Sequence, residues 1–269
     1  MAKLNFKDKW ILITGASSGL GREMARLLAK QEKAHLVITA RRKERLEDLK
    51  KEIEASGNTR VEILQGDLSN TDDVELVFKK AVEIADIYAV INNAGLSFYN
   101  ISKESDMDVF EQIIRVNLLA PMRLCLKFIS YFQQKGEGAI LNITSETGLV
   151  LVPYQSAYSA SKHGIQAFTE GLHMEYRGSG ITICSFAPGG VITEMITNIG
   201  LEKKIELHSR VNMKADIAAR KAIKAFKKKK YLVVPGLLNK ATVFVVRFLP
   251  RWLVGFLAEI IYRPPGLER

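Results

Sequence analysis

The stretch Thr14-Gly-Ala-Ser-Ser-Gly-Leu-Gly21 joins an apolar run, Trp10–Thr14, to an amphipathic segment at residues 20–31. Glycines let a backbone turn tightly and approach an anion closely, and the first turn of the following helix offers unpaired N–H groups to a phosphate. A strand, a glycine-rich turn and a helix in this order predict a dinucleotide site. The spacing is Gly-x3-Gly-x-Gly, which differs from the Gly-x-Gly-x2-Gly of the commonest fingerprint.

Further apolar runs alternate with amphipathic segments along the rest of the chain. The runs lie at residues 35–40, 61–65, 87–92, 139–144, 181–186 and 231–234, and the helix-like segments lie at 43–56, 72–85, 107–134, 156–177 and 214–229. Continuous apolar runs are typical of strands buried on both faces, and the alternation favours a parallel sheet with right-handed crossovers. We therefore expect one doubly wound α/β domain of the Rossmann type with about seven parallel strands.

The charge is distributed unevenly along the 269 residues. The chain has a formal net charge of +10, but residues 203–269 hold 16 Lys+Arg and 4 Asp+Glu, so the first 202 residues are close to neutral. A basic excess indicates an anionic partner, and here it belongs to the end of the chain. Hydrophobic residues make up 47% and charged residues 25%, which excludes a disordered chain.

The end of the second predicted strand indicates which dinucleotide is bound. A carboxylate at this place would bind the adenosine 2′-hydroxyl of NAD, but the sequence reads Ala40-Arg41-Arg42. A guanidinium suits a 2′-phosphate through charge-assisted hydrogen bonds. The alternative is a solvated basic start to the next helix. We favour the phosphate interpretation, which predicts a preference for NADP(H).

Tyr158 and Lys162 are four residues apart on the helical segment 156–177, so they share one helix face. A phenol titrates near 10 and is a poor acid–base group at neutral pH unless its anion is stabilised. A neighbouring ammonium favours the phenolate, which would let the tyrosine exchange a proton with a carbonyl or alcohol. Taken alone, such a pair is more often a surface feature.

The pair is not alone, and the chain resembles the short-chain dehydrogenase/reductase family over about residues 8–235. Residues 14–21 are similar to the TGxxxGxG cofactor turn, and Tyr158 with Lys162 is similar to YxxxK. The other matches are Asp67-Leu68 as the adenine contact, Asn92-Asn-Ala-Gly95 as NNAG, Asn117 as the helix asparagine, Ser145 as the catalytic serine, and Pro188-Gly-Gly-Val-Ile-Thr193 as the PGxxxT segment beside the nicotinamide.

This resemblance implies hydride transfer between a nicotinamide and a carbonyl or secondary alcohol. It implies that Tyr158 is the acid–base residue, that Lys162 lowers its pKa and binds the nicotinamide ribose, and that Ser145 polarises the substrate oxygen. Asn117 would hold a water that links Lys162 to solvent. The cofactor-binding residues that it implies are Gly15, Ser17, Ser18, Gly19, Leu20, Gly21, Arg41, Arg42, Asp67, Leu68, Asn93, Ala94, Gly95, Tyr158, Lys162, Pro188, Gly189, Val191 and Thr193.

Some features leave alternatives open. Ser145 could cap a turn, Asn117 could be an ordinary interior amide, and Glu146 receives no role. The four histidines and two cysteines show no metal-ligand spacing, so we expect no metal site. The alternative to an enzyme is a non-catalytic nucleotide-binding regulatory or membrane-adaptor protein on the same fold, against which the complete motif set argues.

Residues 189–213 lie where the family has a mobile substrate lid. Their apolar side chains predict either a wall for a hydrophobic substrate, such as a lipid-like ketone, or a lid that packs on the core; they are Val191, Ile192, Met195, Ile196, Ile199 and Leu201.

The chain continues past the expected last strand, so we divide it into a catalytic domain, residues 1–236, and an extension, residues 237–269, that is not an independent domain. The apolar stretch 241–262 is interrupted by charges, which favours an amphipathic element broken at Pro250 over a bilayer span. Two interpretations compete. We favour an interfacial membrane anchor next to the lysine run 227–230, and the alternative is a cap over the substrate pocket or against a second subunit.

The remaining expectations concern location and assembly. Two distant cysteines and the lack of a secretory signal favour a cytoplasmic protein, peripheral at a membrane surface if the extension is an anchor. The resemblance implies a homodimer or homotetramer that pairs through residues 107–134 and 156–177. Nucleic acid is not an expected partner, because the aromatic residues of the extension do not interleave with its lysines.

Overall fold

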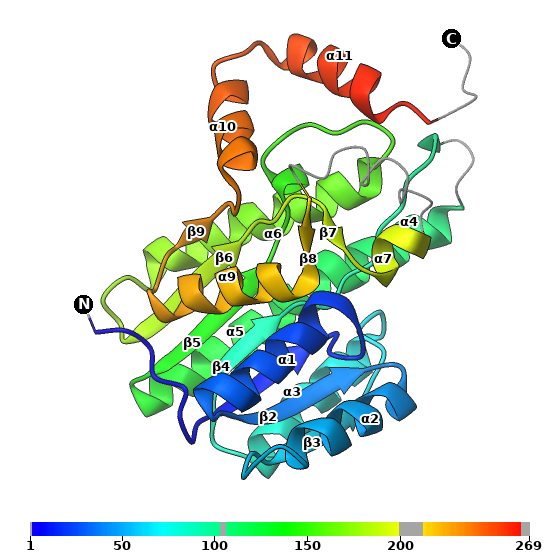
Figure 1. Cartoon of the computed structure of the whole chain (residues 1–269). Helices are drawn as coiled ribbons and strands as arrows, with labels where there is room; N and C mark the ends of the chain where they lie inside the picture. Colours follow the sequence, from blue (N-terminus) through cyan, green and yellow to red (C-terminus); the bar gives the residue numbers. More distant parts are fainter. Residues whose placement is uncertain (1, 103–105, 199–211, 265–269) are drawn as a thin grey trace.

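The computed structural model describes residues 2–102, 106–198 and 212–264, and its centre is a parallel sheet of seven strands. The strand order is β3-β2-β1-β4-β5-β6-β9, which confirms the doubly wound α/β prediction (Figure 1). The strands are β1 (Trp10–Thr14), β2 (His35–Ala40), β3 (Val61–Gln65), β4 (Ile87–Asn92), β5 (Gly138–Ile143), β6 (Ile181–Phe186) and β9 (Leu232–Val233).

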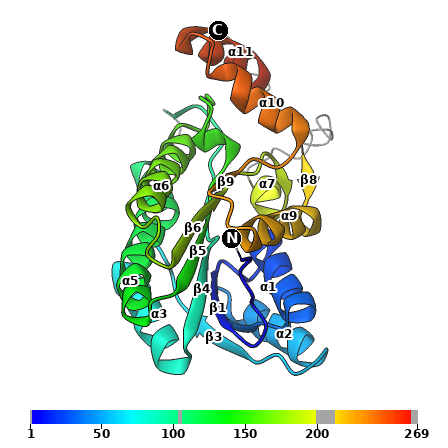
Figure 2. The same ribbon diagram turned by 90° about the vertical axis from the view of Figure 1, so that its left-hand side faces the viewer.

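Helices cover both faces of the sheet, as Figure 2 shows edge-on. One face carries α1 (Gly19–Glu32), α2 (Lys43–Glu54) and α9 (Ala215–Lys227), and the other carries α3 (Thr71–Ile84), α5 (Ala120–Lys135) and α6 (Ser156–Glu175). Each layer has its own apolar cluster, with Met24 and Phe226 in the first and Leu124 and Phe128 in the second. The two layers explain why β4 and β5 are buried along their whole length.

The strand order places the site. The chain moves outward from β1 to β3, then returns to add β4 on the other side of β1, so the two directions separate between β1 and β4. Ligands of open α/β sheets bind at such a switch point, outside the carboxyl ends of the strands. The motifs named above follow β1, β4, β5 and β6 and therefore meet at this edge.

The structure differs from the predicted elements in several details. The segment predicted as one helix at 107–134 consists of α4 (Met107–Ile114), a π-helical turn (Arg115–Leu119) and α5. Residues after β6 form a small second sheet of β7 (Val191–Ile192) and β8 (Met213–Lys214), with α7 (Glu194–Asn198) between them in sequence. A short 3-10 turn, Glu146–Gly148, follows β5. Two-residue strands have too few positions to show a period in the sequence.

The C-terminal extension forms two helices above the carboxyl edge of the sheet, α10 (Leu237–Val246) and α11 (Arg251–Tyr262) (Figure 1). Pro250 immediately precedes α11. A proline is tolerated at a helix start, because an N–H at that place would have no hydrogen-bond partner within the helix. Among the residues that the structure describes, no helix has the length and hydropathy that a membrane span requires.

Candidate active site

The turn after β1 contains positions where the backbone conformation or the nearest atoms leave room only for glycine. Gly15 and Gly19 have φ values of +68° and +53°, in the left-handed region. A Cβ on Gly21 would lie 2.4 Å from both the Asn93 Nδ2 and the carbonyl oxygen of Gly15. The turn therefore brings bare backbone to the N-terminus of α1, as a pyrophosphate site requires.

Hydrogen bonds tie this turn to the segment after β4. The Asn93 amide donates to the carbonyl oxygens of Thr14 at 3.0 Å and Gly15 at 3.2 Å. In return, Thr14 Oγ1 accepts from the backbone N–H groups of Asn93 and Ala94, each at 3.0 Å. The residues that resemble NNAG thus hold the two strand ends together across the switch point.

The two arginines after β2 have different surroundings. Arg42 donates from Nη2 to the hydroxyls of Ser17 at 3.2 Å and Ser18 at 2.9 Å, and from Nη1 to Glu194 at 2.9 Å. Glu194 is also paired with Arg45, and hydrogen bonds from Arg45 and then Arg42 hold the pKa of this carboxyl below its usual range. Arg41 is exposed at the rim of the same cavity. Both predicted arginines therefore border the glycine turn, and only Arg42 bonds to it.

Asp67 and Leu68 lie at the end of β3 and line the cavity on the side of Ala40. The Asp67 carboxylate accepts hydrogen bonds from the backbone N–H of Ser69 at 3.0 Å and its hydroxyl at 2.9 Å. Its position is therefore fixed by the turn that leads into α3.

Tyr158 and Lys162 lie on the face of α6 that borders the cavity. Lys162 is only 4% exposed, its Nζ donates to the carbonyl of Ile143 at 3.0 Å, and it lies 5.7 Å from the centroid of the Tyr158 ring. Burial lowers the pKa of this ammonium to about 8. Burial also raises the pKa of the Tyr158 phenol, against the opposite effect of hydrogen bonds from Ser145 and Thr147.

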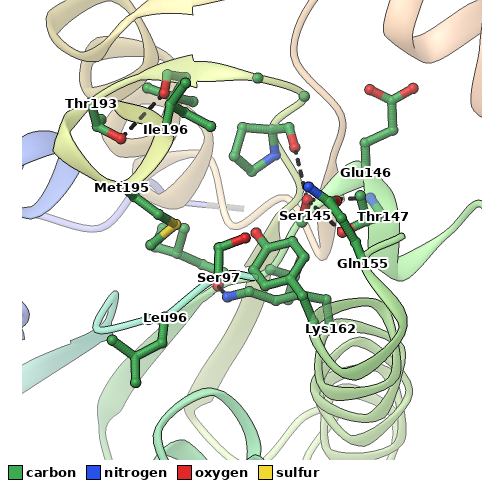
Figure 3. Close-up of a pocket in the computed structure, with 18 of the residues that line it drawn as sticks. Leu96, Ser97, Ser145, Glu146, Thr147, Gln155, Lys162, Thr193, Met195 and Ile196 are labelled. Carbon is green, nitrogen blue, oxygen red and sulfur yellow. Dashed lines mark hydrogen bonds between the residues drawn. The ribbon is translucent and has the colours of Figure 1, made fainter. Parts of the chain in front are cut away.

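Ser145 follows β5 and faces the same space. Its Oγ accepts from the backbone N–H of Thr147 at 3.2 Å and from the Thr147 hydroxyl at 3.0 Å, and it is 3.5 Å from the carbonyl of Pro188 (Figure 3). The serine therefore does cap the 3-10 turn, as the structural alternative predicts. The Tyr158 phenol is nevertheless among its hydrogen-bonding neighbours, so capping does not remove it from the site.

Asn117 lies in the π-helical turn, a distortion that often occurs at functional sites. Its side chain exchanges two hydrogen bonds with the backbone of Leu96, each at 2.8 Å, and donates to Ser161 at 3.1 Å. A Cβ on Gly95 would lie 3.4 Å from the Asn117 oxygen and 3.7 Å from Lys162 Nζ. Asn117 thus lies below Gly95, on the side of the buried lysine.

One cavity of about 800 Å³ connects these groups. All the residues predicted for the site line it except Gly21 and Asn117, which lie just beneath its wall. Of the predicted lid residues, Val191, Met195 and Ile196 line the cavity, and Ile192 is exposed. Ile199 and Leu201 lie outside the described residues.

The roof of the cavity comes from the extension, which matches the cap over the substrate pocket that the sequence analysis gave as the alternative to a membrane anchor. The lining residues of α10, α11 and the turn between them are Asn239, Thr242, Val246, Leu249, Val254, Leu257, Ala258, Ile261 and Tyr262. Two tyrosines fasten the roof: Tyr99 donates to the carbonyl of Tyr262 at 2.6 Å, and Tyr154 donates to Glu259 at 2.9 Å. These contacts join residues more than 100 positions apart, and no local pattern reports them.

A search of the described part of the chain for clusters of three or more His, Cys, Asp or Glu side chains finds no candidate metal site.

Comparison with known proteins agrees with this geometry. The short chain dehydrogenase family model matches residues 9–204. The protein belongs to the short-chain dehydrogenase/reductase family and is an oxidoreductase of that family, acting between alcohols and carbonyls.

Two curated relatives and one solved structure illustrate the similarity. The dehydrogenase/reductase SDR family member 7B of Danio rerio is 32% identical over 98% of this chain and 89% of its own length. The 17-beta-hydroxysteroid dehydrogenase type 3 of Danio rerio is 32% identical over 70% of this chain, which spans 62% of that relative. A short-chain dehydrogenase of Sphingobium yanoikuyae, solved with NADPH, is 29% identical with a TM-score of 0.79, covering 90% of this chain and 97% of that one.

Proposed function

We propose that this protein transfers a hydride between NADP(H) and a carbonyl or secondary alcohol of a hydrophobic substrate. The observation that carries the proposal is the single cavity that runs from the glycine turn, past Ser145, Tyr158 and Lys162, to an apolar roof. The turn fits a dinucleotide because Gly15, Gly19 and Gly21 leave a backbone cradle that any Cβ would fill. The catalytic domain of the proposal is residues 1–236, with residues 237–269 as a dependent extension.

Each residue has a proposed task. The nicotinamide, when bound, supplies or accepts the hydride. Tyr158 gives a proton to the carbonyl oxygen or takes one from the alcohol, and Ser145 donates a hydrogen bond to the same oxygen. Lys162, held by the carbonyl of Ile143, favours the phenolate through its charge and binds the ribose. Asn117 orders the path by which Lys162 exchanges protons with solvent.

The preference for NADP(H) rests on the arginines after β2. Arg42 already gathers the Ser17 and Ser18 hydroxyls into one donor cluster, and Arg41 stands at the rim. A 2′-phosphate would find guanidinium and hydroxyl donors here, where a ribose 2′-hydroxyl would find no carboxylate acceptor at the strand end. The NADPH complex of the Sphingobium relative supports this choice.

A hydrophobic substrate is supported by the substrate end of the cavity. The apolar side chains that line the cavity include Val150, Leu151, Val152, Met195, Val254 and Leu257. The steroid dehydrogenase relative acts, by its name, on a large apolar alcohol. We therefore propose a lipid-like or steroid-like ketone.

The extension has two faces, so the two interpretations of the sequence are compatible. Its inner face roofs the cavity, and its outer face exposes Leu237 (89%), Phe248 (73%) and Trp252 (73%). Lys240, Arg247 and Arg251 are exposed in the same segment. Apolar side chains flanked by cations suit an interfacial membrane site, so we propose that the outer face binds an anionic membrane surface and delivers substrate to the cavity.

We also propose that two copies pair through the helices α5 and α6. Three large apolar side chains are exposed on this side of one chain: Leu119 just before α5, Leu126 in α5 and Met174 in α6. A second copy would cover them.

NADPH consumption with a panel of steroid, fatty-acyl and sphingoid ketones tests the proposal. Turnover that depends on Tyr158 supports it. Tight NADPH binding without turnover of any ketone would favour the non-catalytic alternative instead.

A further inference from the structure

Glu146 is a carboxylate in the substrate cavity for which the reaction described above has no use. It follows Ser145 directly and begins the 3-10 turn, and its backbone N–H donates to the carbonyl of Pro188 at 2.8 Å. The 3-10 turn and the hydrogen bond to Pro188 therefore both fix the backbone of Glu146. Figure 3 shows the carboxylate extending away from Ser145 and Thr147, out of the hydrogen-bonded turn.

The carboxylate lies between the catalytic floor and the roof. Its Oε2 would be 2.9 Å from a Cβ on Gly189, and the Asn239 amide nitrogen of α10 would be 2.3 Å from the same Cβ. Tyr262 of α11 is close enough that the Glu146 charge adds to the effect of burial in raising the pKa of its phenol. The glycine at position 189 thus leaves room for two polar groups, one from each side of the cavity.

Among the residues that the structure describes, no neighbouring charge or hydrogen-bond donor contributes to the pKa of this carboxyl. Burial raises its pKa to about 7, and burial is the only cause of the shift. A half-buried carboxyl without a partner costs free energy that a ligand with a donor group would recover. The cavity is also lined by Val150, Val254, Ala258 and Ile261, which offer no donor from their side chains.

We propose that Glu146 is a specificity-determining residue that binds a hydroxyl or ammonium group of an otherwise apolar substrate. This inference rests on the proposed function, because the substrate is the ketone or alcohol whose oxygen meets Ser145 and Tyr158. Glu146 directly follows Ser145, but its carboxylate extends away from Ser145, so the donor group would lie along the substrate chain and not on the reacting carbon. The favoured substrate is therefore an amphiphile that carries a second polar group besides the reacting oxygen.

The test compares ketones that differ only in the donor group. Dodecan-2-one is the reference, and the probes carry a hydroxyl or an amine one, two or three carbons from the carbonyl. Steady-state kinetics with NADPH are measured for the wild type, Glu146→Leu, Glu146→Gln and the control Glu83→Gln, which changes an exposed carboxylate on α3 far from the cavity.

For the wild type, at least one donor-bearing ketone should have a KM about 10-fold or more below that of dodecan-2-one, since hydrogen bonds to charged groups are the strong ones. Glu146→Leu should abolish this advantage, so that the ratio of the two KM values approaches one. Glu146→Gln should keep the advantage of a hydroxyl and lose that of an ammonium. Glu83→Gln should behave as the wild type.

The contrary results are distinct. If dodecan-2-one and its analogues are turned over but the KM ratios are the same in the wild type and Glu146→Leu, Glu146 does not determine specificity and the proposed function stands. If no ketone is reduced by the wild type, the proposed function fails and this inference fails with it. Thermal unfolding of each variant shows whether it is folded, and Glu146→Gln provides the comparison if Glu146→Leu is not.

Discussion

Arg42 and Glu194 form an ion pair of 2.9 Å across the mouth of the cofactor end of the cavity, joining the loop after β2 to the first turn of α7. The same guanidinium bonds to Ser17 and Ser18, so the segment after β6 is fastened to the glycine turn through one side chain. In the proposed function a 2′-phosphate binds here, so Arg42 is the residue on which the proposed preference for NADP(H) depends most.

Replacing Arg42 by alanine should raise the KM for NADPH by about 10- to 100-fold and leave the KM for NADH within a few-fold, because of the two cofactors only NADPH carries a phosphate for the guanidinium to bind. Initial rates with both cofactors measure the effect. Arg45→Ala is the matched control, since Arg45 pairs with Glu194 but has no hydrogen bond to Ser17 or Ser18. Equal losses for NADPH and NADH in Arg42→Ala would contradict the assignment.

Much of the site could be predicted from sequence because its parts are local. The glycine turn, the Tyr158–Lys162 spacing and the strand-end motifs each occupy a few consecutive residues, and parallel strands necessarily bring their carboxyl ends to one edge. For the extension, the sequence left a cap over the substrate pocket and a membrane anchor as alternatives and could not choose between them. Whether α10 and α11 turn inward depends on contacts such as Tyr99 with Tyr262, which join distant parts of the chain.

Gly21→Ala should weaken cofactor binding and lower Tm by several degrees. The added Cβ would lie 2.4 Å from Asn93 Nδ2 and from the Gly15 oxygen, and overpacking of this kind costs about 1–3 kcal/mol. Gly57→Ala is the control, because no atom lies within 4 Å of its Cβ position. Thermal scans with and without NADPH measure both effects; equal behaviour of the two variants would be inconsistent with the tight turn.

Lys162 should make the free energy of unfolding depend on pH. Its pKa is lowered from 10.5 to about 8 by burial, so between these values the unfolded chain binds more protons than the folded one, and stability rises with pH. The buried charge thus destabilises the fold below about pH 8. Lys162→Met should lack this rise, so urea titrations at pH 7.5 and 9.5 should show a larger gain for the wild type. Identical gains would mean that the ammonium is not desolvated.

The outer face of the extension should bind anionic vesicles. Phe248→Ser combined with Trp252→Ser should reduce sedimentation with phosphatidylserine-containing vesicles by about 10-fold or more, because two exposed aromatic side chains no longer enter the interface. Turnover of a water-soluble ketone should be unchanged. Leu76→Ser, an exposed apolar residue on α3, serves as the control. If the double variant binds vesicles as well as the wild type, the outer face of the extension is not the membrane-binding site.

The most direct test of the account is the Tyr158→Phe variant, which removes one hydroxyl from the cavity. The account predicts that kcat for ketone reduction falls by about 10²–10⁴-fold, the usual worth of a positioned acid, while the Kd for NADPH from fluorescence titration stays within about 3-fold. A kcat within about 10-fold of the wild type, with a folded protein and intact NADPH binding, would contradict the assignment of Tyr158 as the proton donor.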